Sequence, residues 1–201
     1  MPNIPVFILL PISMAASLGY GVITRCYARR DGLCSADIHL FNAVTALLSG
    51  LVLLLWGGFG QASAFTLAMG AAFGLIVGLL MLFTLRAVSL GSWSYSTVLI
   101  SLSTLITALS GVAFWGESLS AVQVVGIACM VGCMVLSVAQ DKAPATQKPT
   151  LRWLLMCLLA FLCSGAVGLL QKIHQTSVHR GELSAFLIVA FGVLFLYSAV
   201  M

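Results

Sequence analysis

Gly116-Glu117-Ser118 separates two apolar segments, Ser92–Trp115 and Ala121–Ala139. The first segment is dense in serine and threonine, and the second is rich in small residues. Each approaches the roughly 20 apolar residues that a helix needs to cross a bilayer. Because the turn is so short, we expect the two helices to lie antiparallel and side by side, with the rest of the chain packed around this hairpin.

The charged residues of the chain avoid its apolar segments. Of the 201 residues, 61% are hydrophobic and only 7% are charged, whereas about 25% of a soluble domain is charged. The nine Lys/Arg and five Asp/Glu residues all fall outside seven apolar stretches, which are Val6–Thr24, Ile38–Trp56, Ala64–Leu85, Ser92–Trp115, Ala121–Ala139, Trp153–Leu170 and Leu183–Met201. This partition predicts an all-α membrane protein, a polytopic helical bundle of about seven transmembrane helices.

The remaining chemistry of the chain argues against several classes of protein. The basic residues behind the net charge of +4 stand at helix ends and never alternate with aromatic residues, so we expect no nucleic-acid partner. Cys129 and Cys133 share one helix face, but no histidine or carboxylate lies near them in sequence, so we expect neither a metal nor a cofactor. An enzyme would need paired carboxylates or a Ser/His set inside the spans, where His39 stands alone, so we expect no catalytic residues.

The predicted second helix carries one polar stripe. Its members recur at i, i+3, i+7 and i+10, which places them along one face: His39, Asn42, Ala46 and Ser49. One interpretation is that Asn42 faces a substrate cavity. The other is that His39 lies at the membrane interface and Asn42 bonds a neighbouring backbone.

Two small-polar stripes follow the predicted helix Ser92–Trp115. One holds Ser92, Ser96, Ser103, Thr107 and Ser110, and the other holds Ser94, Thr97, Ser101, Thr104, Ala108 and Gly111. Their hydroxyls can bond the carbonyl one turn earlier, so the helix can lie in lipid unaided. Either both stripes serve packing, or one of them lines a water-filled cavity. The candidate substrate-cavity residues, which would contribute hydrogen bonds rather than charge, are Asn42, Ser96, Ser103 and Thr107.

The predicted third helix contains a doubled G-x-x-x-G motif, made of Gly70, Gly74 and Gly78. A ridge without side chains lets a partner helix approach until the two backbones touch. We therefore expect these glycines to serve helix packing, and they carry no information about a substrate.

The turn before Ala121 contains a capping box. Ser120 stands three residues before Gln123, the spacing at which each side chain can accept a bond from the other residue's amide. Glu117 places negative charge near the positive end of the following helix. No predicted span contains a carboxylate, so the sequence does not support proton coupling through a buried acid.

The chain after residue 150 resembles its own beginning. Cys163-Ser164-Gly165 aligns with Ser17-Leu18-Gly19, and Ser184-Ala185 aligns with Ser35-Ala36. An odd number of spans in the first copy would invert the second copy in the membrane. We therefore predict a first repeat of five helices over residues 1–140, a polar linker over 141–150, and the start of a second repeat, two helices and incomplete, over 151–201.

These features resemble the drug/metabolite transporter superfamily, and within it the EamA-like transporter family. The resemblance is best over three motifs, which are Leu85-Arg86-Ala87-Val88-Ser89, Trp115-Gly116-Glu117-Ser118-Leu119-Ser120 and Gln123-Val124-Val125-Gly126. Leu18 stands where the family usually has tryptophan, and Asn42 stands where it has a basic residue. The resemblance implies a fold of two five-helix repeats, of which this chain covers about the first seven helices.

The resemblance also implies a function. We expect a secondary transporter or exporter of small organic metabolites, such as amino acids or drug-like solutes, that lies in a lipid bilayer, in a bacterial inner membrane, and works by alternating access. The alternative is a non-transporting assembly partner or an inactive truncated transporter. A homodimer or a partner chain would complete the second repeat.

Charge placement and family resemblance predict opposite orientations. Seven basic residues lie in the first, third and fifth connections, which are Arg25, Arg29, Arg30, Arg86, Lys142, Lys148 and Arg152, against two on the other side, Lys172 and Arg180. The positive-inside rule then places the N-terminus outside. Members of the family usually have both termini in the cytoplasm.

Overall fold

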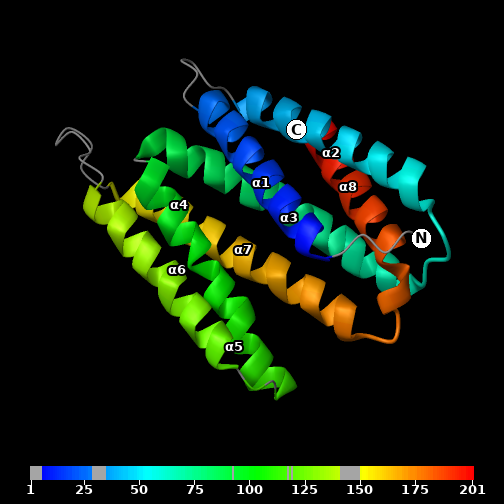
Figure 1. Cartoon of the computed structure of the whole chain (residues 1–201). Helices are drawn as coiled ribbons and strands as arrows, with labels where there is room; N and C mark the ends of the chain where they lie inside the picture. The colour runs from blue at the N-terminus through cyan, green and yellow to red at the C-terminus, as the bar shows by residue number, and fades with distance from the viewer. Residues whose placement is uncertain (1–5, 29–34, 92, 117, 119, 141–149) are drawn as a thin grey trace. The chain divides into compact units, whose positions relative to one another are not determined.

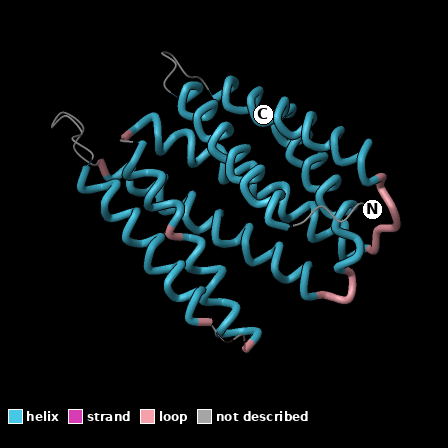
Figure 2. The backbone as a smooth tube through the Cα atoms, in the orientation of Figure 1, coloured by secondary structure: helices cyan, strands magenta, loops and turns pink. Residues whose placement is uncertain are grey.

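The structure, a computed structural model, describes residues 6–28, 35–91, 93–116, 118, 120–140 and 150–201. Every regular element within these residues is a helix (Figures 1 and 2). The chain divides into two compact units, Met1–Leu33 and Cys34–Met201. The first unit holds a single described helix, α1 (Val6–Ala28), with Pro11 inside it.

The second unit contains the other helices. They are α2 (Ser35–Gly57), α3 (Ala64–Leu90), α4 (Trp93–Ser101), α5 (Ser103–Trp115), α6 (Ala121–Gln140), α7 (Leu151–Thr176), the short 3-10 helix η1 (Arg180–Glu182) and α8 (Leu183–Val200). Five stretches of the described chain are long and apolar enough to cross a bilayer, namely Ala36–Gly57, Ala64–Leu90, Trp93–Trp115, Leu151–Thr176 and Arg180–Val200. With α1 and α6 at the other two predicted places, the prediction of an all-α helical membrane bundle is confirmed.

Helix α3 is the centre of the second unit. It packs most extensively against α7 and α8, and α8 also packs along α2 (Figure 1). The three glycines of α3 face α8, and a Cβ added at Gly74 would meet the backbone oxygen of Ala190. A Cβ at Gly70 would lie 2.8 Å from the Phe186 oxygen. Because no side chain separates the two backbones, this contact is among the closest that two membrane helices can make.

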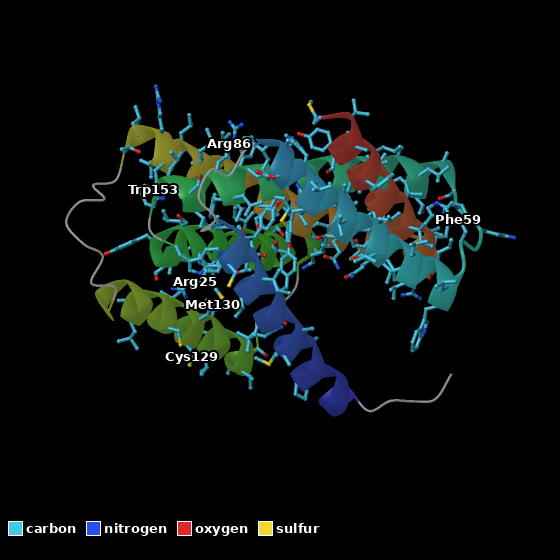
Figure 3. The ribbon with its side chains drawn as sticks, turned by 90° about the horizontal axis from the view of Figure 1, so that it is seen from above. Arg25, Phe59, Arg86, Cys129, Met130 and Trp153 are labelled. Carbon is cyan, nitrogen blue, oxygen red and sulfur yellow. The ribbon has the colours of Figure 1, made fainter. Side chains whose placement is uncertain are left out.

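This arrangement differs from the expected one, in which the chain packs around the Ser92–Ala139 hairpin. Helix α6 contacts α4, but most of its described side chains are exposed. Gly126 and Gly132 have open space where a Cβ would stand. Figure 3 shows Met130 turned towards the neighbouring helices and Cys129 turned away from them. The glycine ridge that meets a partner backbone is on α3, so the packing centre lies there.

Helices α2 and α8 run antiparallel along one another. A Cβ at Gly50 would lie 3.5 Å from Phe191 Cβ, and a Cβ at Gly57 would lie 3.5 Å from Ser184 Cβ. The two contacts are seven residues apart on each helix and run in opposite directions. By contrast, residue numbers increase in the same direction along the contacts of α3 with α8, in which Gly70 meets Phe186 and Gly74 meets Ala190. These two helices are therefore parallel.

Candidate functional site

The predicted span Ser92–Trp115 corresponds to α4 and α5, which adjoin at the single residue Leu102 (Figure 2). Leu102 keeps right-handed helical φ and ψ angles of −59° and −19°, so the span tightens for one turn and continues. At this point the Leu105 amide donates to the Leu102 oxygen, three residues back, at 3.0 Å. The hydroxyl of Thr104 donates to the Ser101 oxygen at 2.8 Å. Serine and threonine hydroxyls can replace a lost backbone bond in this way, which makes such a tightened turn tolerable in lipid. The described residues Trp93–Trp115 thus form one membrane-length span, as predicted, with a local turn of three-residue bonding at Leu102.

The first small-polar stripe faces α7. Ser103, which is 1% exposed, donates from its hydroxyl to Ser164 Oγ at 2.6 Å. One turn further along α5, Thr107 occupies the space that a Cβ on Gly168 would need. These contacts position Ser103 and Thr107 between two helices, where they hold α5 against α7.

Ser96, on α4, is fully buried and belongs to the same seam. The indole Nε1 of Trp153 donates to Ser96 Oγ at 2.9 Å, and Ser96 Oγ lies 3.5 Å from the Ala87 oxygen, to which it donates. The ring of Trp153 fills the space above Gly91. Figure 3 shows Trp153 and Arg86 at the same end of the second unit. The hydroxyl of Ser96 thus links the end of α3, α4 and the beginning of α7.

Two members of the second small-polar stripe, Thr104 and Ala108, face an open groove. This groove has a volume of about 350 Å³ and lies between α5 and α6, and its lining includes Thr104, Ala108, Gln123, Gly126, Met130 and Lys172. Thr104 also donates a long bond of 3.5 Å to Met130 Sδ. At the outer end of the groove, Lys172 Nζ stands 5.2 Å from the centre of the Trp115 ring. The groove therefore combines an apolar floor with a few polar groups.

The beginning of α6 has the geometry of a capping box. The Ser120 amide donates to Gln123 Oε1 at 2.8 Å, and the Gln123 amide donates to Ser120 Oγ at 3.3 Å. Gly116 ends α5 in the left-handed conformation, with a φ of 62° that glycine adopts without strain. Glu117 lies outside the described residues.

Asn42 lies apart from the serines of α4 and α5, on the buried face of α2. Its side chain is 2% exposed, and its Nδ2 has no hydrogen-bond partner. His39, one turn earlier, is 6% exposed, and its ring meets the Tyr197 ring of α8 edge-on at 5.8 Å. Its Nδ1 also lacks a partner. The structure thus separates the four candidate cavity residues into two groups, and their role in binding a substrate stays a prediction.

A second polar cluster, which the sequence analysis did not find, joins the beginning of α3 to the connection between α7 and α8. Glu182 Oε2 accepts bonds of 2.8 Å from both the amide and the hydroxyl of Ser63, the N-cap residue of α3. Thr66 Oγ1 lies 3.3 Å from Nε2 of His174, which is fully buried under the Phe186 ring. A carboxylate at the N-terminus of a helix is stabilised by the free amides and the helix dipole.

The fold and these contacts define a polytopic α-helical membrane protein. The model of the EamA-like transporter family matches residues 7–139, more than half of the chain. The protein therefore belongs to the EamA-like transporter family, a family of integral membrane transporters, and the resemblance seen in the sequence is confirmed. No curated protein and no solved structure matches the chain.

Proposed function

We propose that this protein is a secondary transporter that moves small organic solutes across a bacterial inner membrane by alternating access. The observation that carries the proposal, beyond family membership, is the hydroxyl-rich span α4–α5. This span lies within a stretch long enough to cross the membrane, Trp93–Trp115, and its buried Ser103 bonds Ser164 of α7. Polar side chains inside a membrane usually face the interior of the bundle and mark solute pathways.

The contacts of α5 with α7 support movement at this seam. They include one hydroxyl pair, Ser103 with Ser164, and small-residue contacts in which Ile106 meets Gly165 and Thr107 meets Gly168. At the end of α5, Trp115 also donates from its indole nitrogen to Thr176 Oγ1 at 3.2 Å. The small-residue part of this surface can slide, since a hydroxyl there can exchange one oxygen partner for another. We propose that α5 shifts against α7 when the site changes access.

The antiparallel contact of α2 with α8 supports an inverted repeat. If residues 1–140 and 151–201 belong to two copies, α2 and α8 are the second helix of each copy, and an inverted pair must run in opposite directions. Because α7 and α8 pack on α3 and α2, the copies would close around a shared site. A second copy of the chain, or a partner chain, would supply the remaining helices of the second repeat.

Solute counterflow in liposomes tests the proposal. The purified protein is reconstituted with a labelled solute outside and a panel of unlabelled carboxylates, amino acids and amines inside. We expect exchange with part of the panel, and slower exchange for Asn42→Leu and Ser103→Ala. Thr45→Val is the matched control, because the Thr45 hydroxyl bonds only the Phe41 oxygen of its own helix. Absence of exchange with every solute would favour the alternative of an assembly partner without transport.

A further inference from the structure

Three buried polar atoms lie unpaired on α2 and α8. They are Nδ1 of His39, Nδ2 of Asn42 and Oγ of Ser198, and the three residues are 6%, 2% and 5% exposed. An unpaired polar group costs several kcal/mol, roughly, when it faces hydrocarbon, so membrane proteins rarely leave one without a partner. Three such atoms in the described part of one helix pair therefore need an explanation.

The register of the two helices places these atoms at one level. His39 and Asn42 are three residues apart and share a face of α2. Gly50 on α2 lies beside Phe191 on α8, and the two helices are antiparallel. Asn42 precedes Gly50 by eight residues, and Ser198 follows Phe191 by seven. Asn42 and Ser198 therefore lie at nearly the same level along the helix pair. The ring contact of His39 with Tyr197 confirms this register independently.

The third wall of this site is α3. A Cβ at Gly78 would lie 3.2 Å from Leu194 and 2.8 Å from the Tyr197 ring. Ser198 follows Leu194 by one turn and therefore lies on the face of α8 that is turned towards α3. The absence of a side chain at Gly78 is what allows Tyr197 to reach between α2 and α3.

The three atoms share one chemical property. The amide nitrogen of Asn42 and the hydroxyl of Ser198 donate hydrogen bonds, and Nδ1 of His39 donates whenever it carries the proton. A carboxylate is the group that fits such a set, since it accepts several bonds and gains extra strength from its charge.

We propose that His39, Asn42 and Ser198 form a binding site for the carboxylate group of a small organic solute. The proposal rests on the proposed function in that the bound solute is the transported one. It also specifies the chemical class of that solute, an organic acid or amino acid rather than an amine.

Binding of a simple carboxylate, measured without transport, tests the site. Purified protein is dialysed against labelled propionate, with propionamide as the neutral isostere and sodium chloride as the ionic control. We expect saturable binding of propionate that propionamide does not displace. Asn42→Asp keeps the shape of the side chain but sets a like charge against the ligand, so affinity should fall about tenfold or more. Ser198→Ala should weaken binding less, and the Thr45→Val control should bind as the wild type does.

The outcomes separate this inference from the proposed function. Propionate binding that depends on Asn42 and Ser198, without counterflow of any carboxylate, would keep the site and overturn the transport proposal. Counterflow that is equally fast in Asn42→Asp and wild type would keep transport and overturn the carboxylate site. Equal binding of propionate and propionamide, or no saturable binding, would also overturn it, because the unpaired atoms would then hold only water.

Discussion

At the scale of single residues, Gly74 makes the closest approach to a partner backbone among the described glycines. A Cβ at this position would meet the backbone oxygen of Ala190, and its carbonyl carbon at 3.1 Å. Backbone cannot move aside as a flexible side chain can, so Gly74→Ala must push α3 and α8 apart. We expect the free energy of unfolding to fall by about 1–3 kcal/mol, as for other overpacked sites. Thermal unfolding of the protein in detergent, followed by size-exclusion chromatography, measures the change.

The control for this variant is Gly132→Ala on α6, where a Cβ meets open space. That substitution should leave the unfolding temperature unchanged or slightly higher, because alanine is the better helix former. Equal unfolding temperatures for the two alanine variants would contradict the α3–α8 contact described above.

Ser63 carries a second residue-scale prediction. Its hydroxyl accepts a bond from the Thr66 amide at 3.2 Å and donates to Glu182. Ser63 therefore caps α3 and joins the start of α3 to the connection between α7 and α8. Ser63→Ala should cost about 1 kcal/mol, the usual value of a lost N-cap. Glu182→Gln should also destabilise the protein, because the neutral amide interacts less with the helix N-terminus.

The double variant of Ser63 and Glu182 distinguishes a shared network from two separate effects. If the two side chains act through one another, the loss in the double variant is smaller than the sum of the single losses. Strict additivity would show that the bond between the Ser63 hydroxyl and Glu182 contributes nothing to stability, since Ser63→Ala leaves the bond from the Ser63 amide in place.

At the scale of elements, the tightened turn at Leu102 depends on one hydroxyl. Thr104 satisfies the Ser101 oxygen at this turn, and Thr104→Val keeps the volume while it removes this bond. We expect a loss of about 1–2 kcal/mol, the cost of one backbone acceptor left without a partner in lipid. Thr45→Val removes a similar bond from the regular helix α2 and should be nearly neutral. If both valine variants unfold at the same temperature, Thr104 does not stabilise the turn.

The elements show which features could be predicted from sequence. Apolar segments free of charge predicted the helices well, because the bilayer imposes length and composition on each span independently of the others. The tightened turn at Leu102 could not be predicted, since a continuous hydropathy pattern does not reveal a change from four-residue to three-residue bonding. The cluster of Ser101, Ser103 and Thr104 was the available signal.

Which helix forms the centre of the packing could not be read from local pattern. The Ser/Thr-rich hairpin and the glycine ridge both suggested close contacts, and only the ridge of α3 meets a partner backbone. The bond between Ser63 and Glu182 joins residues 119 positions apart, so no periodicity within one segment could indicate it. Of the four candidate cavity residues, Ser96 and Ser103 bond other helices, whereas Asn42 is left with an unpaired donor.

At the scale of the whole molecule, the antiparallel register of α2 and α8 can be tested by cross-linking. A Cβ at Gly57 would lie 3.5 Å from Ser184 Cβ, within the roughly 3.5–4.5 Å that separates cysteine Cβ atoms in a disulfide. In a background without the six native cysteines, the pair Gly57→Cys and Ser184→Cys should oxidise readily. The pair Gly57→Cys and Phe191→Cys should not, because seven residues shift the partner by about 10 Å along the helix. Intact mass after alkylation counts the free thiols.

The same cross-link tests how the two predicted repeats move. If α2 and α8 belong to different repeats that rock against each other, a disulfide between residues 57 and 184 fixes one access state. Solute counterflow should then stop on oxidation and return on reduction, while binding of a carboxylate at the far end of the helix pair should persist. Exchange that continues with the disulfide formed would mean that α2 and α8 move as one body. In that case the change of access would have to arise elsewhere in the bundle, and the hydroxyl seam between α5 and α7 would be the next contact to cross-link.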